Sequence, residues 1–267
     1  MKRLLVLVKQ VPVTENVKMD PETGTMIRTG IETIVNPLDL YAVEEAVRLK
    51  EATDEDVRVC ALSMGPPGAA ETIREAIAMG CDDGVLLTGR EFAGSDTWAT
   101  AYALAKGIEH LGGFDLILCG ERATDGETGQ VGPMVGTLLG LPVVTYVSRI
   151  ARTEADAVIA HRAIEGGHEV IRCSLPALAC VVKEINEPRL PTLKGKVTAR
   201  RSEIEVLNAE AIEANGDCLG LGGSPTRVVK VFYPTLTRSG VIVSTEEESV
   251  EECVDRLIDF LRTRELV

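Results

Sequence analysis

The chain has 267 residues and a formal net charge of −13, from 41 acidic and 28 basic residues. This excess of acid argues against a general nucleic-acid-binding surface or an anionic-membrane surface. Hydrophobic residues make up 45% of the sequence and aromatic residues only 3%, so an aliphatic core can support one large α/β domain, with or without an extension.

The cysteines and the N-terminus indicate the compartment. The seven cysteines include no Cys-x-x-Cys pair, so neither a zinc site nor an Fe–S cluster would find ligands at the required spacing. We expect no bound metal. The apolar run Leu4–Val8 is too short for a signal peptide, and no segment reaches the roughly 18 apolar residues of a membrane span. We expect a cytoplasmic protein without membrane insertion, with buried free thiols. The thiols within apolar runs are Cys60, Cys119, Cys173 and Cys180.

Short apolar runs alternate with helical patterns over the first 150 residues. Helices are expected after Asn36, which precedes a proline at the first helical position, and over Pro67–Met79 and Asp96–Leu111. Continuous apolar runs are typical of strands buried on both faces. These runs are Arg3–Lys9, Val57–Ser63, Gly84–Thr88, Phe114–Gly120 and Pro142–Val147. The alternation predicts an α/β fold with a doubly wound parallel sheet, in which ligands bind beyond the carboxyl ends of the strands.

Two stretches depart from this alternation. MDPETGTMIRTG (Met19–Gly30) contains a turn signal, PETG, whose flanks can pair as a small hairpin. After Val147 the pattern predicts a hairpin around Gly166–Gly167 and then another strand. We expect this part to be an antiparallel addition at the edge of the sheet.

The compact pattern fades from Asn186 onward. Five basic residues and no acidic residue lie between Arg189 and Arg201, which predicts an extended arm. Such a run is usually a solvated surface, although the apolar Leu193 within it can anchor a partner. A terminal helix is expected over Thr245–Leu266, acidic at its start and basic at its end, and we expect it to pack on a partner subunit. Its apolar stripe is Val250, Val254, Leu257, Ile258 and Leu261.

Four loops follow strands at one edge of the expected sheet. Their small residues let a flat ligand approach the backbone, and the helix N-termini offer N–H groups to phosphate. These patterns leave two readings open, a nucleotide site and ordinary α/β connections rich in turn residues. No G-x-G-x-x-G or Walker A lysine pattern is present, which excludes a plain Rossmann dehydrogenase and a P-loop enzyme. The loops start at Leu7, Ser63, Gly94 and Glu121.

The fourth of these loops is ERATDGETGQVGP (Glu121–Pro133). Its acidic residues Glu121, Asp125 and Glu127 would repel phosphate, unless they meet ribose hydroxyls, the Arg122 guanidinium or solvent. Catalytic side chains are scarce: no nucleophile elbow or Cys–His pair is present. Any chemistry would therefore be carried by a cofactor.

Five stretches together resemble the beta subunit of electron transfer flavoprotein over essentially the whole chain. They are VKQVP (Val8–Pro12), NPLDLYAVEEAVRLKE (Asn36–Glu51), SMGPP (Ser63–Pro67), LILCGERATDGETGQVGP (Leu116–Pro133) and EPRLPTLKGKVTARRSEIEV (Glu187–Val206). The resemblance implies a heterodimer whose alpha subunit carries most contacts to an electron-transferring FAD. It implies a Rossmann-like domain, residues 1–185, that holds an adenine nucleotide. Residues 186–267 would dock partners and pack on the alpha subunit.

The loops and the resemblance together give two sets of expected site residues. The docking set, with Leu193 at the anchor position for an acyl-CoA dehydrogenase-type partner, also contains Lys194, Lys196, Arg200 and Arg201. The cofactor-binding set is Leu7, Lys9, Asn36, Asp39, Ser63, Met64, Gly65, Asp96, Thr97, Gly120, Arg122, Asp125, Gly126, Thr128, Gln130, Val131 and Gly132.

The family divides on what fills the nucleotide site. In ordinary members AMP stabilises the fold. In electron-bifurcating members a second FAD takes hydride from NADH, and one electron goes to ferredoxin or flavodoxin while the other goes through the alpha-subunit FAD to a dehydrogenase. DGETGQVGP (Asp125–Pro133) and GSPTRV (Gly223–Val228) resemble the bifurcating branch. Gly126 stands where AMP-type members tend to carry a bulkier acidic residue, and its missing side chain leaves room for a flavin.

We therefore expect FAD in this site, with NADH as the substrate of the heterodimer. The first alternative is an ordinary carrier subunit that holds structural AMP and passes electrons between a dehydrogenase and a quinone oxidoreductase. The second is a stand-alone nucleotide-binding regulator of the stress-protein type. It would share the α/β pattern but would need neither the arm nor the terminal helix.

Overall fold

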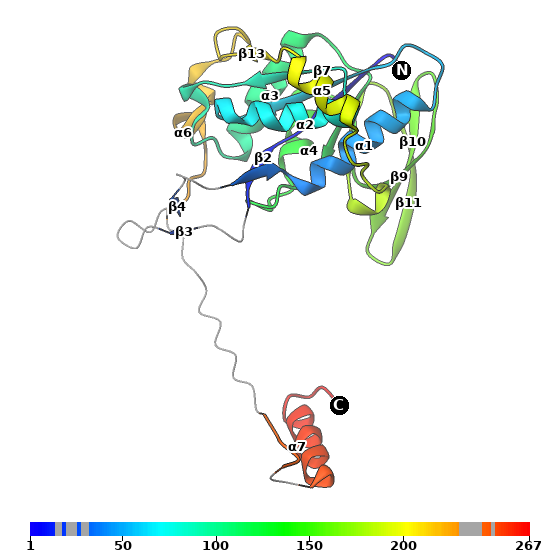
Figure 1. Cartoon of the computed structure of the whole chain (residues 1–267), viewed down its shortest axis with the longest axis vertical. Coiled ribbons are helices and arrows are strands. Elements are labelled where there is room, and N and C mark those ends of the chain that lie inside the picture. The colour runs from blue at the N-terminus through cyan, green and yellow to red at the C-terminus, as the bar shows by residue number, and fades with distance from the viewer. Residues whose placement is uncertain (14–17, 20–25, 28–31, 230–241, 247–248) are drawn as a thin grey trace. The chain divides into compact units, whose positions relative to one another are not determined.

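Figure 1 shows a computed structural model of the chain, which describes residues 1–267 except 14–17, 20–25, 28–31, 230–241 and 247–248. The chain divides into two compact units, Met1–Val231 and Phe232–Val267.

The first unit is built on a nine-stranded sheet with the order β11-β10-β9-β12-β8-β1-β6-β7-β13. All neighbours from β9 to β13 in this order pair in parallel, which confirms the predicted parallel sheet. Every apolar run predicted as a strand lies in it. The strands are β1 (Arg3–Leu7), β6 (Arg58–Met64), β7 (Asp83–Leu87), β8 (Leu116–Gly120), β9 (Val143–Thr153), β10 (Ala157–Ile164), β11 (Gly167–Ser174), β12 (Ala177–Val181) and β13 (Glu205–Leu207).

Helices cover both faces of the sheet, as a doubly wound fold requires (Figure 1). Leu4 and Val6 of β1 face the side covered by α1 and α2, and Leu5 faces the side covered by α3 and α4. All three are fully buried, and burial of each stabilises the fold by about 1.5–3 kcal/mol. The main helices are α1 (Pro37–Glu51), α2 (Ala70–Met79), α3 (Thr97–Leu111) and α4 (Val131–Leu138). The shorter helical turns are η2 (Pro67–Ala69), η3 (Arg90–Phe92), η4 (Lys183–Ile185), η5 (Gly216–Cys218) and α6 (Gly220–Gly223).

The predicted antiparallel addition forms one edge of the sheet. β10 pairs antiparallel with both β9 and β11, and the β10–β11 turn places Gly166 at a φ of 82°. The strand that follows the hairpin, β12, does not stay at this edge. It enters the sheet between β9 and β8, where it is buried along its whole length.

Two small antiparallel pairs lie outside the main sheet. β2 (Gln10–Pro12) pairs with β5 (Thr33–Val35), a pairing that the sequence did not suggest. β3 (Lys18–Met19) pairs with β4 (Met26–Ile27), as expected for the flanks of the first hairpin. The predicted PETG turn between them lies outside the described residues.

Residues 193–201, expected within an extended arm, form the helix α5 (Leu193–Arg201). Thr192 caps this helix, because its Oγ1 accepts a hydrogen bond from the Gly195 N–H at 2.9 Å. α5 packs on α2, and the following β13 joins the sheet beside β7. These contacts make α5 and β13 part of the first unit.

The second unit contains α7 (Val250–Thr263), within the span predicted for a terminal helix. Ser249 and Glu252 form a capping box at its start. No residue of α7 is buried, and Val250, Val254 and Leu257 of the predicted apolar stripe are exposed. Among the helices of the described ranges, α7 included, none has both the length and the apolar character needed to cross a membrane.

Candidate functional site

The carboxyl ends of the parallel strands β8, β1, β6 and β7 lie next to one another at one edge of the sheet. From β1 the chain moves outward through β6 and β7, and then returns with β8 to the other side of β1. The crevice between β1 and β8 is therefore the switch point of the sheet, where open α/β folds bind ligands. Leu7 ends β1, and the loop that starts at Glu121 follows β8 directly.

Asn36 holds the loop after β8 from the start of α1. Its Nδ2 donates to the Arg122 carbonyl at 2.9 Å, and its Oδ1 accepts from the Thr124 N–H at 3.2 Å. The same Nδ2 donates to Asp39 Oδ1 at 2.8 Å. Asn36 is fully buried, so these bonds form a rigid polar connection between two loops.

The carboxylate of Asp39 is surrounded by donors. Its Oδ2 accepts from the Lys9 N–H at 2.8 Å, and the Gly120 N–H also donates to it. Burial raises the pKa of Asp39 to about 7, although the donors oppose this shift by favouring the charged form. A Cβ on Gly120 would lie 2.6 Å from Asp39 Oδ1, so a side chain at this position would collide with the carboxylate.

Two of the three acidic residues of the loop, Glu121 and Asp125, have basic partners. Lys9 Nζ pairs with Asp125 at 2.7 Å across the crevice, and Arg122 pairs with Glu121 at 2.9 Å. The Arg122 guanidinium thus meets Glu121 and not Asp125. The negative charges of Glu121 and Asp125 are therefore compensated within the site, so these two carboxylates would not strongly repel a bound phosphate.

Helix α4 begins without a side-chain cap. Gln130 makes no capping hydrogen bond, and Pro133 at the third helical position has no N–H. The first N–H groups of the helix, including that of Val131, are therefore left for a ligand or solvent. Gly132 packs on two thiols: a Cβ there would lie 2.6 Å from Cys180 Sγ and 2.7 Å from Cys119 Sγ. Glycine at this position lets α4 start close to the sheet.

Ser63 supplies a buried hydroxyl near the end of β6. It is fully buried, and its Oγ has no hydrogen-bond partner among the described residues. A buried hydroxyl without a partner is costly, so a ligand that reaches this atom would gain from it. Met64 ends the same strand, and Gly65 anchors the following turn through a 3.0 Å hydrogen bond from its N–H to the Leu87 carbonyl.

Asp96 is the N-cap of α3, directly before Thr97. Its Oδ1 accepts from the N–H groups of Trp98 and Ala99, both at 3.0 Å. Its Oδ2 accepts from the hydroxyl of Thr226 at 2.7 Å and from the Thr226 N–H at 2.9 Å. Asp96 therefore joins α3 to the GSPTRV stretch, and it already occupies the N-terminus of this helix.

The tip of the loop is open. Asp125, Gly126, Thr128 and Gln130 are exposed, and a Cβ on Gly126 would meet no atom within 4 Å. Gly126 also lies outside the left-handed region, because its φ is not positive. Neither packing nor backbone strain in this chain therefore calls for glycine at this position.

Comparison with known proteins shows the family of the chain. The model of the electron transfer flavoprotein domain matches residues 23–212. The chain belongs to the electron transfer flavoprotein family. It is similar to the electron transfer flavoprotein subunit beta of Megasphaera elsdenii, at 43% identity over 99% of both chains. It is also similar to the caffeyl-CoA reductase–Etf complex subunit CarD of Acetobacterium woodii, at 42% identity over 99% of this chain and 100% of the other. The acryloyl-CoA reductase electron transfer subunit gamma of Anaerotignum propionicum is 41% identical over 96% of this chain and 98% of its own.

In this electron transfer flavoprotein chain, the predicted docking residues lie away from the switch-point loops, on α5. Leu193 is 82% exposed and the preceding Leu190 is 88% exposed. The four basic residues of the docking set are exposed as well, and no described carboxylate pairs with them. We refer to residues 186–202, which contain all of these, as the basic segment.

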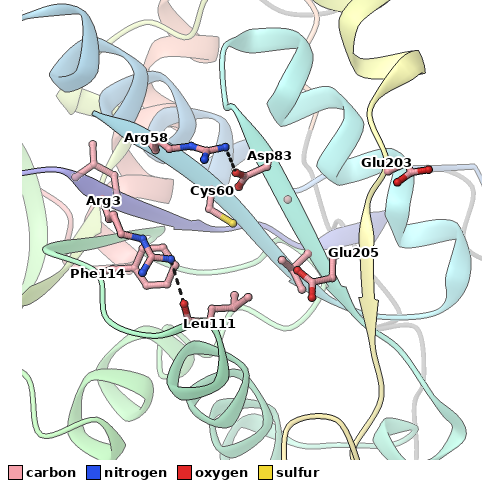
Figure 2. A pocket seen from close by; sticks show the side chains of 11 residues that line it. Arg3, Arg58, Cys60, Asp83, Leu111, Phe114, Glu203 and Glu205 are labelled. Carbon is pink, nitrogen blue, oxygen red and sulfur yellow. Dashed lines mark hydrogen bonds and ion pairs between the residues drawn. The ribbon is translucent and has the colours of Figure 1, made fainter. Parts of the chain in front are cut away.

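The chain also has a hollow of about 350 Å³ at the opposite edge of the sheet (Figure 2). Its two arginines are engaged. Arg58 pairs with Asp83 at 2.8 Å, while Arg3 donates to the Leu111 carbonyl and stacks over the Phe114 ring at 4.5 Å. No group of three or more candidate metal ligands gathers here or elsewhere in the described residues. This hollow lies at the amino ends of the strands and takes no part in the candidate nucleotide site.

Sequence reasoning found the loops of the candidate site but missed several contacts between them. These contacts join residues that are far apart in the chain. They are the hydrogen bonds from Thr226 to Asp96, the Lys9–Asp125 ion pair and the packing of Gly132 on the thiols of Cys119 and Cys180. The seven cysteines are free, and of the four expected to be buried only Cys60 is partly exposed.

Proposed function

We propose that this chain is the beta subunit of a heterodimeric, electron-bifurcating electron transfer flavoprotein and that its switch-point loops hold FAD. The observation that carries the proposal is the combination of an uncapped α4 with the unpartnered hydroxyl of Ser63 at one sheet edge. The free N–H groups at the start of α4 suit the diphosphate of a nucleotide, and the Ser63 hydroxyl suits a ribose or a base. The similarity to CarD and to the acryloyl-CoA reductase subunit favours the bifurcating branch.

The chain's own residues would bind and orient the nucleotide. Asn36 and Asp39 fix the path of the loop, Lys9 holds Asp125 at its tip, and the first turn of α4 receives the phosphates. When bound, a flavin supplies hydride acceptance and electron transfer. The open space at Gly126 favours FAD over AMP, because an isoalloxazine ring needs room beyond the adenosine half.

The heterodimer would oxidise NADH and pass electrons to ferredoxin or flavodoxin and to an acyl-CoA dehydrogenase-type enzyme. The basic segment would dock this enzyme, with Leu193 as the anchor and its four unpaired cations around it. The exposed apolar stripe of α7 would pack on the alpha subunit. We place the heterodimer in the cytoplasm, in keeping with seven free thiols.

Cofactor stoichiometry tests this proposal. The chain is purified anaerobically with its alpha subunit, the complex is denatured, and FAD and AMP are quantified by chromatography. Two FAD and no AMP per heterodimer are expected. One FAD and one AMP would contradict bifurcation and leave an ordinary electron carrier. The AMP figure decides the case, since a flavin can be lost during purification.

NADH oxidation is tested separately on the same sample. Adding NADH under anaerobic conditions should bleach the flavin absorbance of the heterodimer. A complex that contains two FAD but does not bleach would overturn the assignment of NADH as substrate while leaving the FAD assignment in place.

A further inference from the structure

The helices that begin at the nucleotide loops also hold the basic segment. α1 starts at Asn36 and Asp39, and its body contacts the start of the segment. α2 follows the Ser63 loop, and α5 packs along it. The sequence stretches NPLDLYAVEEAVRLKE and EPRLPTLKGKVTARR therefore meet in space, although 135 or more residues separate them.

Arg189 forms the main connection to α1. Its Nε and Nη2 donate to the two oxygens of Glu44 at 2.8 and 3.1 Å, and its Nη1 and Nη2 donate to those of Glu51 at 2.7 and 2.8 Å. Its backbone N–H donates to Glu44 as well, at 3.1 Å. Bidentate arginine–carboxylate pairs fix orientation as well as distance. Glu44 is buried, which shields this pair from solvent.

Further contacts hold the two ends of the basic segment. At its start, Asn186 Nδ2 donates to the Tyr41 carbonyl and to Glu45 Oε2, both at 3.0 Å. At its end, Arg74 Nη1 donates to the Ala199 carbonyl at 2.6 Å and to the Ser202 carbonyl at 3.0 Å. The charge of Arg74 thereby complements the C-terminal end of α5.

The two exposed leucines lie between these connections. Leu190 follows Arg189 directly, and Leu193 starts α5, one turn before Val197 on the same side of the helix. All three are exposed while the residues on either side are fixed. An apolar anchor that is already ordered loses less conformational entropy when a partner binds it.

We propose that Arg189, through Glu44 and Glu51, is a positioning residue that presents Leu193 in its docking conformation. This inference rests on the proposed docking role of the basic segment. Arg189 does not touch the partner enzyme in this scheme. Its effect on electron exchange passes through the orientation of Leu193.

The test uses the full heterodimer with its cofactors and a purified short-chain acyl-CoA dehydrogenase reduced by its acyl-CoA substrate. Arg189→Gln should raise the KM for the heterodimer by roughly threefold to tenfold, the size of coupling between residues of one network. The kcat and the flavin content should stay unchanged. Arg189→Lys, which keeps the charge but loses the double bidentate pairing, should give an intermediate KM.

A double variant tests whether Arg189 acts through Leu193. In the Leu193→Ala background, adding Arg189→Gln should cause no further rise in KM. Independent, multiplying effects would overturn the inference. Arg172→Gln is the matched control, because Arg172 on β11 also contacts two acids, Glu154 at 3.0 Å and Asp156 at 2.8 Å, which both lie in the turn between β9 and β10. It should leave the KM unchanged.

The outcomes separate this inference from the proposed function. A raised KM in Leu193→Ala with an unchanged KM in Arg189→Gln would overturn the positioning role alone. An unchanged KM in both variants would overturn the docking role of the basic segment, and the inference with it. If Arg189→Gln fails to fold, Glu51→Gln removes only the exposed partner, and the same rise in KM is expected from it. Limited trypsin digestion adds a second measurement: cleavage after Lys194 should be faster in Arg189→Gln than in the wild type.

Discussion

The side chain of Asn36 donates a 2.8 Å hydrogen bond to the buried carboxylate of Asp39. Through this contact and those to Arg122 and Thr124, the first turn of α1 holds the loop after β8. The loop that would carry the nucleotide is therefore ordered by buried groups of another element, and the exposed Thr128 and Gln130 near its end remain available for the ligand. The protonation of Asp39 links this arrangement to pH.

Asp39→Asn should change how stability depends on pH. Since its pKa is raised from 3.8 to about 7 by burial, the folded protein keeps a proton that the unfolded chain releases. The stabilisation from this group is complete below about pH 4 and is lost as pH rises to 7, with an upper bound of about 4 kcal/mol. The stability of the wild type relative to Asp39→Asn, measured by urea unfolding, should therefore fall across this range.

Asp96→Asn provides a control of opposite sign. Partial burial raises the pKa of Asp96, but hydrogen bonds from Ala99 and Thr226 outweigh it and hold the pKa below its usual value. The stabilisation from this group is present at neutral pH and is lost as pH falls through the lowered pKa. A wild-type advantage over Asp39→Asn that stays constant from pH 4 to pH 7 would contradict the assignment for Asp39.

Much of this fold follows from the sequence. Continuous apolar runs such as Leu4–Leu7 are typical of strands in a parallel sheet covered on both faces, and the structure has this sheet. The basic segment differs from the prediction, because its composition indicated an extended arm and the structure has a helix there. Helix α5 forms there because Thr192 caps its start and Arg74 hydrogen-bonds the carbonyls at its end. The Thr192 cap joins residues only three apart, but Arg74 lies on α2, far away in the chain, and its contact cannot be read from local sequence.

The candidate site was predictable in outline only. Its loops carry small residues and follow strands, so their shared edge is implied by topology. The specific pairs, such as Lys9 with Asp125 and Asp96 with Thr226, depend on how distant loops approach. A single sequence contains no signal for these distances.

Ser63→Ala should weaken nucleotide binding without weakening the fold. Its Oγ has no partner among the described residues, so the variant removes an unsatisfied buried hydroxyl and should leave stability equal or slightly higher. If the nucleotide bonds to this atom, affinity should fall by about 1 kcal/mol, or roughly fivefold. Equilibrium dialysis of FAD and AMP against the apo heterodimer measures the affinity, and thermal unfolding of the apo form measures stability. Unchanged affinity would remove Ser63 from the site.

Gly126→Glu should lower the FAD content of the heterodimer. The added side chain has open space around its Cβ, so the fold should tolerate it while the carboxylate crowds the flavin half and repels phosphate. Gly126→Ala is the control, and it should retain FAD because a methyl group fills little of that space. Full FAD occupancy in Gly126→Glu would mean that the flavin half does not lie against this position.

Gly132→Ala should destabilise the start of α4. The new Cβ would lie 2.6 Å from Cys180 Sγ and 2.7 Å from Cys119 Sγ, so the helix or the thiols must move, at a cost of about 1–3 kcal/mol. Nucleotide affinity should fall too, because the N–H groups of this turn shift. The double variant Gly132→Ala/Cys180→Ala restores space and should recover part of both losses. Equal stability of Gly132→Ala and wild type in thermal unfolding would show that α4 starts farther from the sheet.

Leu193→Ala should slow electron exchange with the acyl-CoA dehydrogenase without altering flavin content. Leu193 is 82% exposed and lies on α5, away from the switch-point loops. Its truncation should therefore cost the free chain little stability. An anchor residue contributes about 1–4 kcal/mol to binding, so the KM for the heterodimer should rise by at least fivefold. Val170→Ala on β11 is the matched control, because Val170 is also exposed, at 63%, but lies on the opposite edge of the sheet. Stopped-flow reduction with both variants decides the matter: equal rates for Leu193→Ala and Val170→Ala would place the docking surface elsewhere.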